Sequence, residues 1–356
     1  MTIAFVMPCL NEEAFVGAAA SSLGFGECVD PAAEDVFLIL VDNGSTDQTR
    51  AIMESIAVAS RRGSVRIVVE PQRGFVPARG RGALVAAELA KERGVQSERL
   101  LVLQADADTH YFPGYADGMS QALGGRQGCL LEGVIRRSEE FDAEHPEYAA
   151  LETVIDAQFQ EGAVTDEDDV IVDDKACGYL LSDYMRWGQH VREEDRQGGT
   201  VHAETTRLFL RARLGHGASK IRVDSAEAVS SRRRILEEPA LHFATSGFPR
   251  ESAWLGEWRR KHPAQWTVDE FARSQDHPDV RDACFYRRAH NVALFALLPW
   301  IVGRAADPRG FSPPDEGSER LLSLIPDLSR EELVENPAHA LTAVLSAIEQ
   351  WPDAFR

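Results

Sequence analysis

Four short apolar runs recur along the first third of the chain, and each is followed by a polar turn and then by a helix-favouring stretch. The runs cover residues 2–7, 36–41, 65–69 and 100–103. Continuous apolar runs of this length are typical of strands that are buried on both faces of a parallel sheet. The alternation of such strands with helices predicts a doubly wound, mainly parallel α/β sheet.

Later in the chain, helical periodicity dominates the pattern. Residues 127–135 predict a fifth strand, and the apolar spacing over residues 141–160 predicts a helix. Residues 280–305 and 318–350 predict further helices on either side of a Pro-rich segment. The chain therefore combines an α/β part with a C-terminal helical appendage.

Composition and charge exclude several classes of partner. The formal net charge of -19 argues against a broad nucleic-acid surface, and the Arg232–Arg234 run is too short to reverse this. The five cysteines are scattered without a Cys-x-x-Cys pair, which favours reduced thiols in a cytoplasm. The longest apolar run, Val292–Val302, is interrupted by Pro299 and is too short to span a bilayer. With no secretion signal recognised, we expect a cytoplasmic protein with no membrane span.

Two acidic residues, Asp106 and Asp108, follow the fourth predicted strand and are separated by one small residue. Ligands of open α/β sheets bind outside the carboxyl ends of the strands. Two carboxylates this close repel each other, and a hard divalent cation relieves the repulsion. The pair therefore predicts a cation site that can hold a diphosphate, with a solvated acidic turn as the alternative.

Four motifs recur at the ends of the predicted strands: residues 8–13 (PCLNEE), 41–47 (VDNGSTD), the Gly-rich Arg79–Ala83 segment, and 104–109 (QADADT). In this order they resemble the motifs of a GT-A glycosyltransferase of the family-2 type, and the resemblance covers residues 1 to about 135. It implies a GT-A fold, which is a doubly wound, Rossmann-like sheet that binds a sugar nucleotide with Mg²⁺ or Mn²⁺. The family transfers the sugar to an acceptor nucleophile.

On this basis we divide the chain into three parts. Residues 1–135 would form the nucleotide-sugar-binding half of a GT-A domain, and residues 136–245 its acceptor-binding half. Residues 246–356 would form the C-terminal helical region.

The resemblance implies roles for residues on the donor side. Pro8, Asn11 and Glu13 would line the nucleoside pocket, and Asp42 would accept a hydrogen bond from the base. From its Gly-rich segment, which we interpret as a loop, Arg79 would reach the diphosphate. Asn11 would also cap the helix that follows it.

The same resemblance implies a metal centre. Asp106 would contact ribose or metal, and Asp108 would be the firmer metal ligand. Members of this fold often add a late histidine as a further ligand, and His242 is the candidate by position.

The general base of inverting family members is the second of two consecutive acids that precede a helical arginine. Counting back from Arg211 gives Glu204 and Thr205, so the second acid is absent. We therefore assign the base to Glu204, aided by His202, and expect an inverting transfer. A charge favoured by the helix dipole is the alternative role for Glu204.

The acidic stretch over residues 165–174 is interpreted as an exposed loop, with a second metal site as the alternative. Asp173 and Asp174 close this stretch and receive no role of their own.

Other function classes fit the motifs less well. A phosphatase of the haloacid dehalogenase kind would need Thr or Val where His110 stands, and a dehydrogenase would need Gly-x-Gly-x-x-Gly after the first strand. A sugar-phosphate nucleotidyltransferase and a sugar-nucleotide-binding protein without transferase activity stay open. The resemblance thus implies a metal-dependent glycosyltransferase, and we expect a hexosyltransferase. A UDP-sugar is the favoured donor, with dTDP- and GDP-sugars left open. The acceptor would be a small molecule, a lipid-linked intermediate or a saccharide, and homodimerisation is left open.

Overall fold

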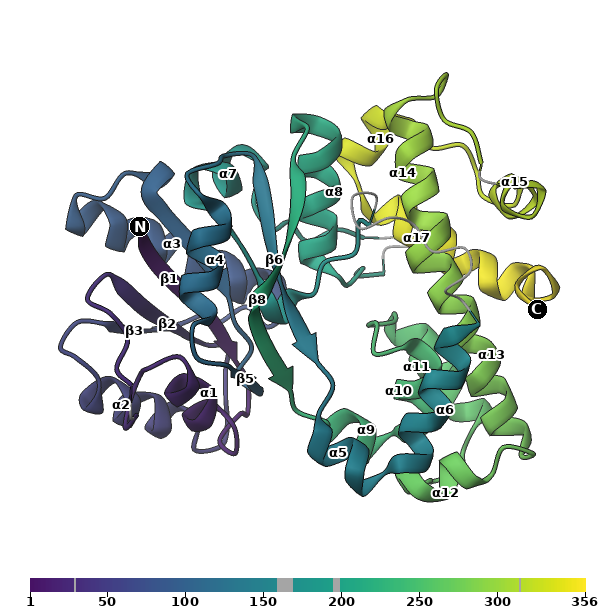
Figure 1. The fold of residues 1–356 in the computed structure, drawn as a ribbon, viewed down its shortest axis with the longest axis horizontal. Helices are drawn as coiled ribbons and strands as arrows, with labels where there is room; N and C mark the ends of the chain where they lie inside the picture. Colours follow the sequence, from purple (N-terminus) through teal and green to yellow (C-terminus); the bar gives the residue numbers. More distant parts are fainter. Residues whose placement is uncertain (29, 159–168, 195–198, 314) are drawn as a thin grey trace.

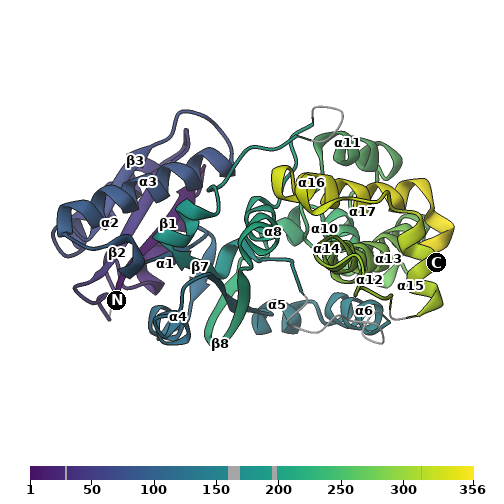
Figure 2. The same ribbon diagram turned by 90° about the horizontal axis from the view of Figure 1, so that it is seen from above.

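The structure, a computed structural model, describes residues 1–28, 30–158, 169–194, 199–313 and 315–356. Figure 1 shows an α/β region built on one sheet, coloured purple to teal, and a helical region beside it in green and yellow. The view from above in Figure 2 shows the same two regions along the length of the molecule.

Within the described residues, one eight-stranded sheet forms the α/β region, in the order β3-β2-β1-β4-β7-β6-β8-β5. The strands are β1 (Thr2–Cys9), β2 (Val36–Asp42), β3 (Val65–Val69), β4 (Leu100–Gln104), β5 (Thr109–Tyr111), β6 (Cys129–Arg136), β7 (Cys177–Leu180) and β8 (Ser219–Ser230). Strands β1 to β4 are parallel, as predicted. β7 runs antiparallel to both β4 and β6, and β5 runs antiparallel to β8, so the whole sheet is mixed.

Helices cover both faces of the sheet because the side chains of each buried strand alternate between two cores. Odd-numbered side chains of residues 3–7 pack with the helices on one face, and even-numbered ones pack with those on the other. The first face carries α1 (Val16–Ser22), α2 (Thr49–Ala59) and α4 (Tyr115–Leu123); the second carries α3 (Phe75–Arg93) and α8 (Glu204–His216). The predicted α/β class is confirmed.

The predicted Gly-rich loop is wrong, because α3 runs through it without interruption. At Gly82 an added Cβ would lie 2.2 Å from Val6 Cγ1, so glycine is present for close packing of α3 on β1. The predicted cap is wrong as well. Asn11 has a left-handed φ of 57° and α1 begins later, at Val16, with no side-chain cap.

The C-terminal helical region is also confirmed. Over the predicted residues 246–356 it contains α11 (Ser252–Lys261), α12 (Val268–Arg273), α13 (Pro278–Val292), α14 (Leu298–Ala306), α15 (Glu316–Ser323), α16 (Arg330–Glu335) and α17 (Ala338–Gln350). Two further helices, α9 (Arg233–Glu237) and α10 (Pro239–Thr245), come before residue 246, in the part predicted as the acceptor-binding half. A π-helical turn, Ala293–Leu297, joins α13 to α14 just before Pro299. Such a turn accommodates a proline, which lacks an N–H and crowds the preceding turn.

The helix predicted over residues 141–160 is split at Pro146 into α5 (Glu139–Glu144) and α6 (Pro146–Ala157); residues 159 and 160 lie outside the described part. Proline suits the first turn of a helix, and so it starts α6. Tyr148, Leu151 and Ile155 of α6 pack with α10, α12 and α13 in a core of their own. α6 thus belongs by packing to the helical region, as Figure 1 shows.

Among the described residues, one helical stretch, Pro278–Ala306, is long and apolar enough to cross a membrane by length and composition. Its 18-residue window has a mean hydropathy of 1.2 and is 67% buried inside the protein. Buried core helices pass the same test, so the stretch is weak support for a membrane span.

Candidate functional site

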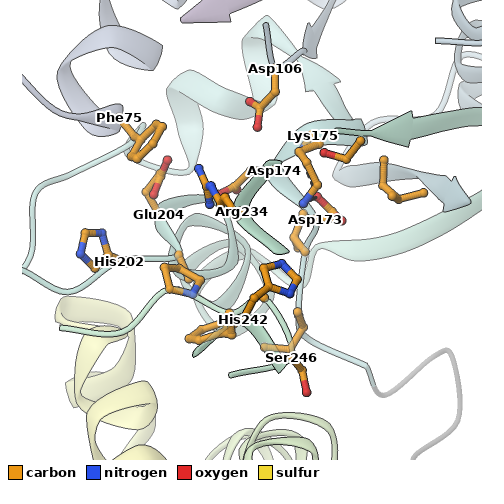
Figure 3. A pocket seen from close by; sticks show the side chains of 18 of the residues that line it. Phe75, Asp106, Asp173, Asp174, Lys175, His202, Glu204, Arg234, His242 and Ser246 are labelled. Carbon is orange, nitrogen blue, oxygen red and sulfur yellow. Dashed lines mark hydrogen bonds and ion pairs between the residues drawn. The ribbon is translucent and has the colours of Figure 1, made fainter. Parts of the chain in front are cut away.

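A cavity of about 380 Å³ lies at the carboxyl end of β4. Six residues predicted for the site line it: Arg79, Asp106, Asp108, His202, Glu204 and His242. Arg79 lies on α3, and Asp106 and Asp108 follow β4. Glu204 begins α8, His202 lies just before it, and His242 lies on α10. The fold thus gathers residues that lie far apart in the sequence. Figure 3 shows the cavity from close by.

Arg79 is the centre of the cavity's charge network. Its guanidinium donates hydrogen bonds to Gln104 at 2.8 Å, to Asp106 at 3.1 Å and to Glu204 at 3.1 Å, and the side chain is only 1% exposed. Burial alone would lower the pKa of Arg79, but the carboxylates around it raise that pKa well above its usual value. The arginine is therefore a fixed positive charge that neutralises two acids of the wall. Its predicted contact with a diphosphate stays a prediction.

Asp108 has an arginine partner of its own. Arg233 lies 3.2 Å from the Asp108 carboxylate, which also accepts a hydrogen bond from Ser231 at 3.1 Å. The sequence predicts that a cation relieves the repulsion between Asp106 and Asp108. In the structure, two guanidinium groups balance these charges.

The predicted metal centre has hard oxygen donors but no preformed cage. No three His, Cys, Asp or Glu side chains converge as a metal site in the part of the chain that the structure describes. Asp106 and Asp108 nevertheless fit Mg²⁺ or Mn²⁺, because such ions are commonly held by one or two carboxylates together with substrate phosphates and water.

His242 lines the cavity on the side opposite Asp106 in the view of Figure 3. Its Nδ1 atom is buried and has no hydrogen-bond partner among the described residues. Burial, with Arg232 and other cations nearby, lowers the pKa of His242 to about 3, so the ring is neutral. A neutral imidazole has a free lone pair, but the surrounding cations oppose a metal ion there, and the role of His242 as a ligand stays a prediction.

The other residues predicted to bind the donor nucleotide lie outside the cavity wall, at the ends of β1 and β2 and in the loop that follows β1. Asn11 accepts a hydrogen bond from the Thr46 N–H at 2.8 Å, and Glu13 accepts one from the Gln48 N–H at 2.8 Å. Asp42 accepts a hydrogen bond from the Ser45 N–H at 3.0 Å. These contacts fix the two loops to each other at the edge of the sheet where β1 and β2 end. Pro8, the fourth of these residues, is the penultimate residue of β1.

Three further residues line the cavity and were not predicted from the sequence: Asp173, Asp174 and Lys175. The predicted exposed loop is therefore wrong for Asp173 and Asp174, while residues 165–168 lie outside the described part. Because β7 is antiparallel to β4, residues that precede β7 reach the edge where β4 ends. The sequence does show two acids, Asp173 and Asp174, shortly before β7. It does not show whether β7 is parallel or antiparallel to its neighbours, and so it does not show that these acids reach the site.

Comparison with known proteins supports the family resemblance for the first part of the chain. Residues 4–115 match the model of the family described as Glycosyl transferase family 2. This match includes the loops after β1 and β2, Arg79 and the Asp106–Asp108 pair. The resemblance predicted from the sequence is thus confirmed over these residues. No curated protein matches the sequence.

Several solved structures resemble the chain at a distance. S. aureus TarS, residues 1–349, is 14% identical with a TM-score of 0.46, covering 98% of this chain and 92% of its own. The mannosyltransferase PcManGT from Pyrobaculum calidifontis, in complex with GDP-Man and Mn²⁺, is 15% identical with a TM-score of 0.46, covering 98% and 87%. Glucosyl-3-phosphoglycerate synthase from Mycobacterium tuberculosis, with Mn²⁺, UDP and phosphoglyceric acid, is 19% identical with a TM-score of 0.38, covering 65% and 70%. Similarities this distant carry no argument about activity.

Proposed function

We propose that the protein is a metal-dependent glycosyltransferase that moves a hexose from a UDP-sugar to an acceptor hydroxyl. The observation that carries this proposal is the position of Asp106 and Asp108, which lie within the family-matched segment and line a cavity where β4 ends. The cavity offers space for a sugar and an acceptor next to that acidic pair. We further propose a cytoplasmic protein.

Asp106 and Asp108 would hold the Mg²⁺ or Mn²⁺ ion. A bound divalent cation supplies positive charge that offsets the negative charge developing on a leaving diphosphate. The carboxylates are held by their surroundings, because Arg79 donates a hydrogen bond to Asp106 at 3.1 Å and Ser231 donates one to Asp108 at 3.1 Å. These contacts orient both side chains.

The chain's own residues would do the rest of the binding. The interlocked loops that carry Asn11, Glu13 and Asp42 would hold the nucleoside, and Arg79 would keep the cavity wall charged and rigid. Inversion at the sugar carbon needs a base on the acceptor side of the cavity. The assignment of that base to Glu204, with help from His202, stays a prediction from the sequence.

A donor panel tests the proposal. UDP-, GDP- and dTDP-sugars are offered with Mn²⁺ or Mg²⁺, and both nucleotide release and melting temperature are recorded. We expect UDP plus metal to raise the melting temperature, since a ligand that binds only the folded state stabilises it. Asp108→Ala should remove the metal-dependent part of that shift, whereas Asp117→Ala, at an exposed position on α4, should retain it.

The alternatives give different outcomes in this experiment and in a parallel assay with a nucleoside triphosphate and a sugar phosphate. Stabilisation without turnover of any donor would favour a sugar-nucleotide-binding protein. Release of pyrophosphate from a nucleoside triphosphate and a sugar phosphate would identify a nucleotidyltransferase. An unchanged metal-dependent shift in Asp108→Ala would remove Asp108 from the metal site.

A further inference from the structure

Thr205 is completely buried at the position where the family resemblance places the catalytic acid. An acceptor hydroxyl that attacks a sugar must lose its proton to a group within hydrogen-bond reach. Two carboxylates of the cavity wall lie near Thr205. One belongs to Glu204, its neighbour in the chain, and the other to Asp174, which lies in the turn before β7. The contacts of these two acids differ.

Glu204 is engaged in an ion pair. Its Oε1 atom accepts a hydrogen bond from Arg79 Nε at 3.1 Å, and the side chain is only 5% exposed. This contact commits the Oε1 atom of Glu204 to Arg79. The contact also orients Arg79 toward Gln104 and Asp106.

Asp174 has a carboxylate oxygen that is free to accept. Its Oδ1 atom is shielded from bulk solvent and has no hydrogen-bond partner within the ranges that the structure describes. Most polar atoms shielded to this extent are satisfied, so the unpartnered Oδ1 atom leaves the Asp174 carboxylate with unused capacity to accept. Asp174 also lines the cavity, where an acceptor hydroxyl would be a donor of the required kind.

A chain of buried hydrogen bonds directs Thr205 toward Asp174. An ionised carboxylate can only accept, so Thr205 donates its hydroxyl proton to Asp174. The Thr205 oxygen is then left to accept from His190 Nε2 at 3.1 Å, which places the ring proton of neutral His190 on Nε2. His190 Nδ1 in turn accepts from the Tyr184 hydroxyl at 3.1 Å, while the Tyr184 oxygen accepts from the His190 backbone N–H.

We propose that Asp174 is the general base of the sugar transfer and that Glu204 is a positioning residue for Arg79. Asp174 thus supplies the carboxylate that is absent at Thr205, and Thr205 holds it in place. This inference rests on the proposed function. It replaces Glu204 with an acid from a different segment of the chain.

In the proposed step, the acceptor oxygen forms a bond to the anomeric carbon while its proton passes to Asp174 Oδ1. The bond between that carbon and the diphosphate oxygen breaks, and its electron pair leaves with the nucleoside diphosphate. No oxidant or further reactant is needed.

The electrostatics of the cavity agree with this assignment. Burial, with the nearby negative charge of Glu204, raises the pKa of Asp174 to about 7, against the lowering effects of Arg79 and Thr205. When the pKa of a base lies near the working pH, a large fraction of the base is unprotonated and its affinity for the acceptor's proton is still high.

Three variants and one control test the inference by sugar transfer, donor binding and melting temperature. For Asp174→Asn we expect kcat to fall about 10²–10⁴-fold while the Kd for UDP and metal stays unchanged. The control Asp117→Asn, at an exposed position on α4 outside the cavity wall, should stay within tenfold of the parent protein. Glu204→Gln should lower the melting temperature and weaken donor binding, because it breaks the Arg79 network. Thr205→Val keeps the side-chain volume and removes the hydroxyl, so it should lower kcat and leave KM unchanged.

The outcomes separate this inference from the function on which it rests. If the parent protein turns over no donor with any acceptor, the proposed function fails and the base assignment fails with it. If the parent is active and Asp174→Asn keeps its kcat, only the assignment of Asp174 is overturned. A loss in Glu204→Gln as large as that expected for Asp174→Asn, with stability and donor binding intact, would return the base to Glu204.

Discussion

The Arg233 guanidinium lies 3.2 Å from the Asp108 carboxylate and donates two further hydrogen bonds to Glu12, at 2.8 Å and 2.6 Å. Arg233 thus connects the loop after β1 with the acidic pair after β4. A cation that binds Asp108 has to compete with this guanidinium for the same carboxylate.

Replacing Arg233 by Gln should therefore lower the Mn²⁺ concentration needed for half-saturation of the nucleotide-free protein, as measured by isothermal titration calorimetry. Arg62→Gln is the control, because Arg62 is exposed in the turn before β3, outside the cavity wall, and its loss should leave Mn²⁺ affinity unchanged. Weaker Mn²⁺ binding in Arg233→Gln would mean that Arg233 organises the carboxylates for the metal instead of competing with it.

Removal of the buried guanidinium of Arg79 should destabilise the protein strongly. Arg79→Met leaves Glu204 and Asp106 without their positive partner, and breaking a buried ion pair in this way costs about 3–5 kcal/mol. Urea denaturation measures the loss. Arg81→Met on the same helix is the control, since Arg81 is more exposed and its contact with Glu88 is long at 4.0 Å. A loss in Arg79→Met as small as in this control would contradict a central role for Arg79.

Two glycines of α3 should respond in opposite directions to the same substitution. Gly82→Ala puts a Cβ 2.2 Å from Val6 Cγ1, so we expect a destabilisation of about 1–3 kcal/mol from overpacking. Gly80 has nothing within 4 Å of an added Cβ, and Gly80→Ala should stabilise the helix by up to about 1 kcal/mol. Thermal unfolding of both variants checks the pair. Equal effects of the two substitutions would argue against the close contact of α3 with β1.

His290 should make the protein less stable in acid. It is fully buried, with Nδ1 donating to the Tyr286 carbonyl and Nε2 accepting from Arg250, and burial lowers its pKa to about 3. In the unfolded chain a histidine titrates near about 6.5. Between these two values the unfolded state binds more protons at this residue, so stability falls as the pH drops from about 6.5 toward 3.

Substitution of His290 by Gln should reduce this pH dependence. The slope of unfolding free energy against pH should become smaller by up to about 1.4 kcal/mol per pH unit within that window, as measured by urea denaturation at a series of pH values. An identical slope in the parent protein and in His290→Gln would show that His290 does not stay neutral in the fold.

The strands β1 to β4 and their order along the chain are predictable from the sequence, because a strand buried on both faces leaves a continuous apolar run. The position of Asp106 and Asp108 follows from the same pattern. Arg79 is different. The glycines next to it in the sequence suggest a loop. Gly82 is instead part of a helix, where it leaves room for the side chain of Val6 on β1. Local residue preferences do not contain that information.

Asp174 illustrates a second limit. Parallel strands bring their carboxyl ends together, and this rule leads only to residues that follow strands. β7 runs in the opposite direction, so it contributes the residues before it. Strand direction is decided by pairing with β4 and β6, which are distant in the sequence. The absence of an acid at Thr205 is visible in the sequence, whereas the acid that stands beside it is visible only in the fold.

The packing of α6 on α12 and α13 makes the two regions inseparable by a single cut. The chain leaves the sheet for the helical region at α5 and α6, returns to build β7, α8 and β8, and then leaves again. A fragment that ends at residue 245 would lack α12 and α13 and would expose Tyr148, Leu151 and Ile155 to water. Such a fragment should aggregate, so soluble expression of the sheet requires the C-terminal helices.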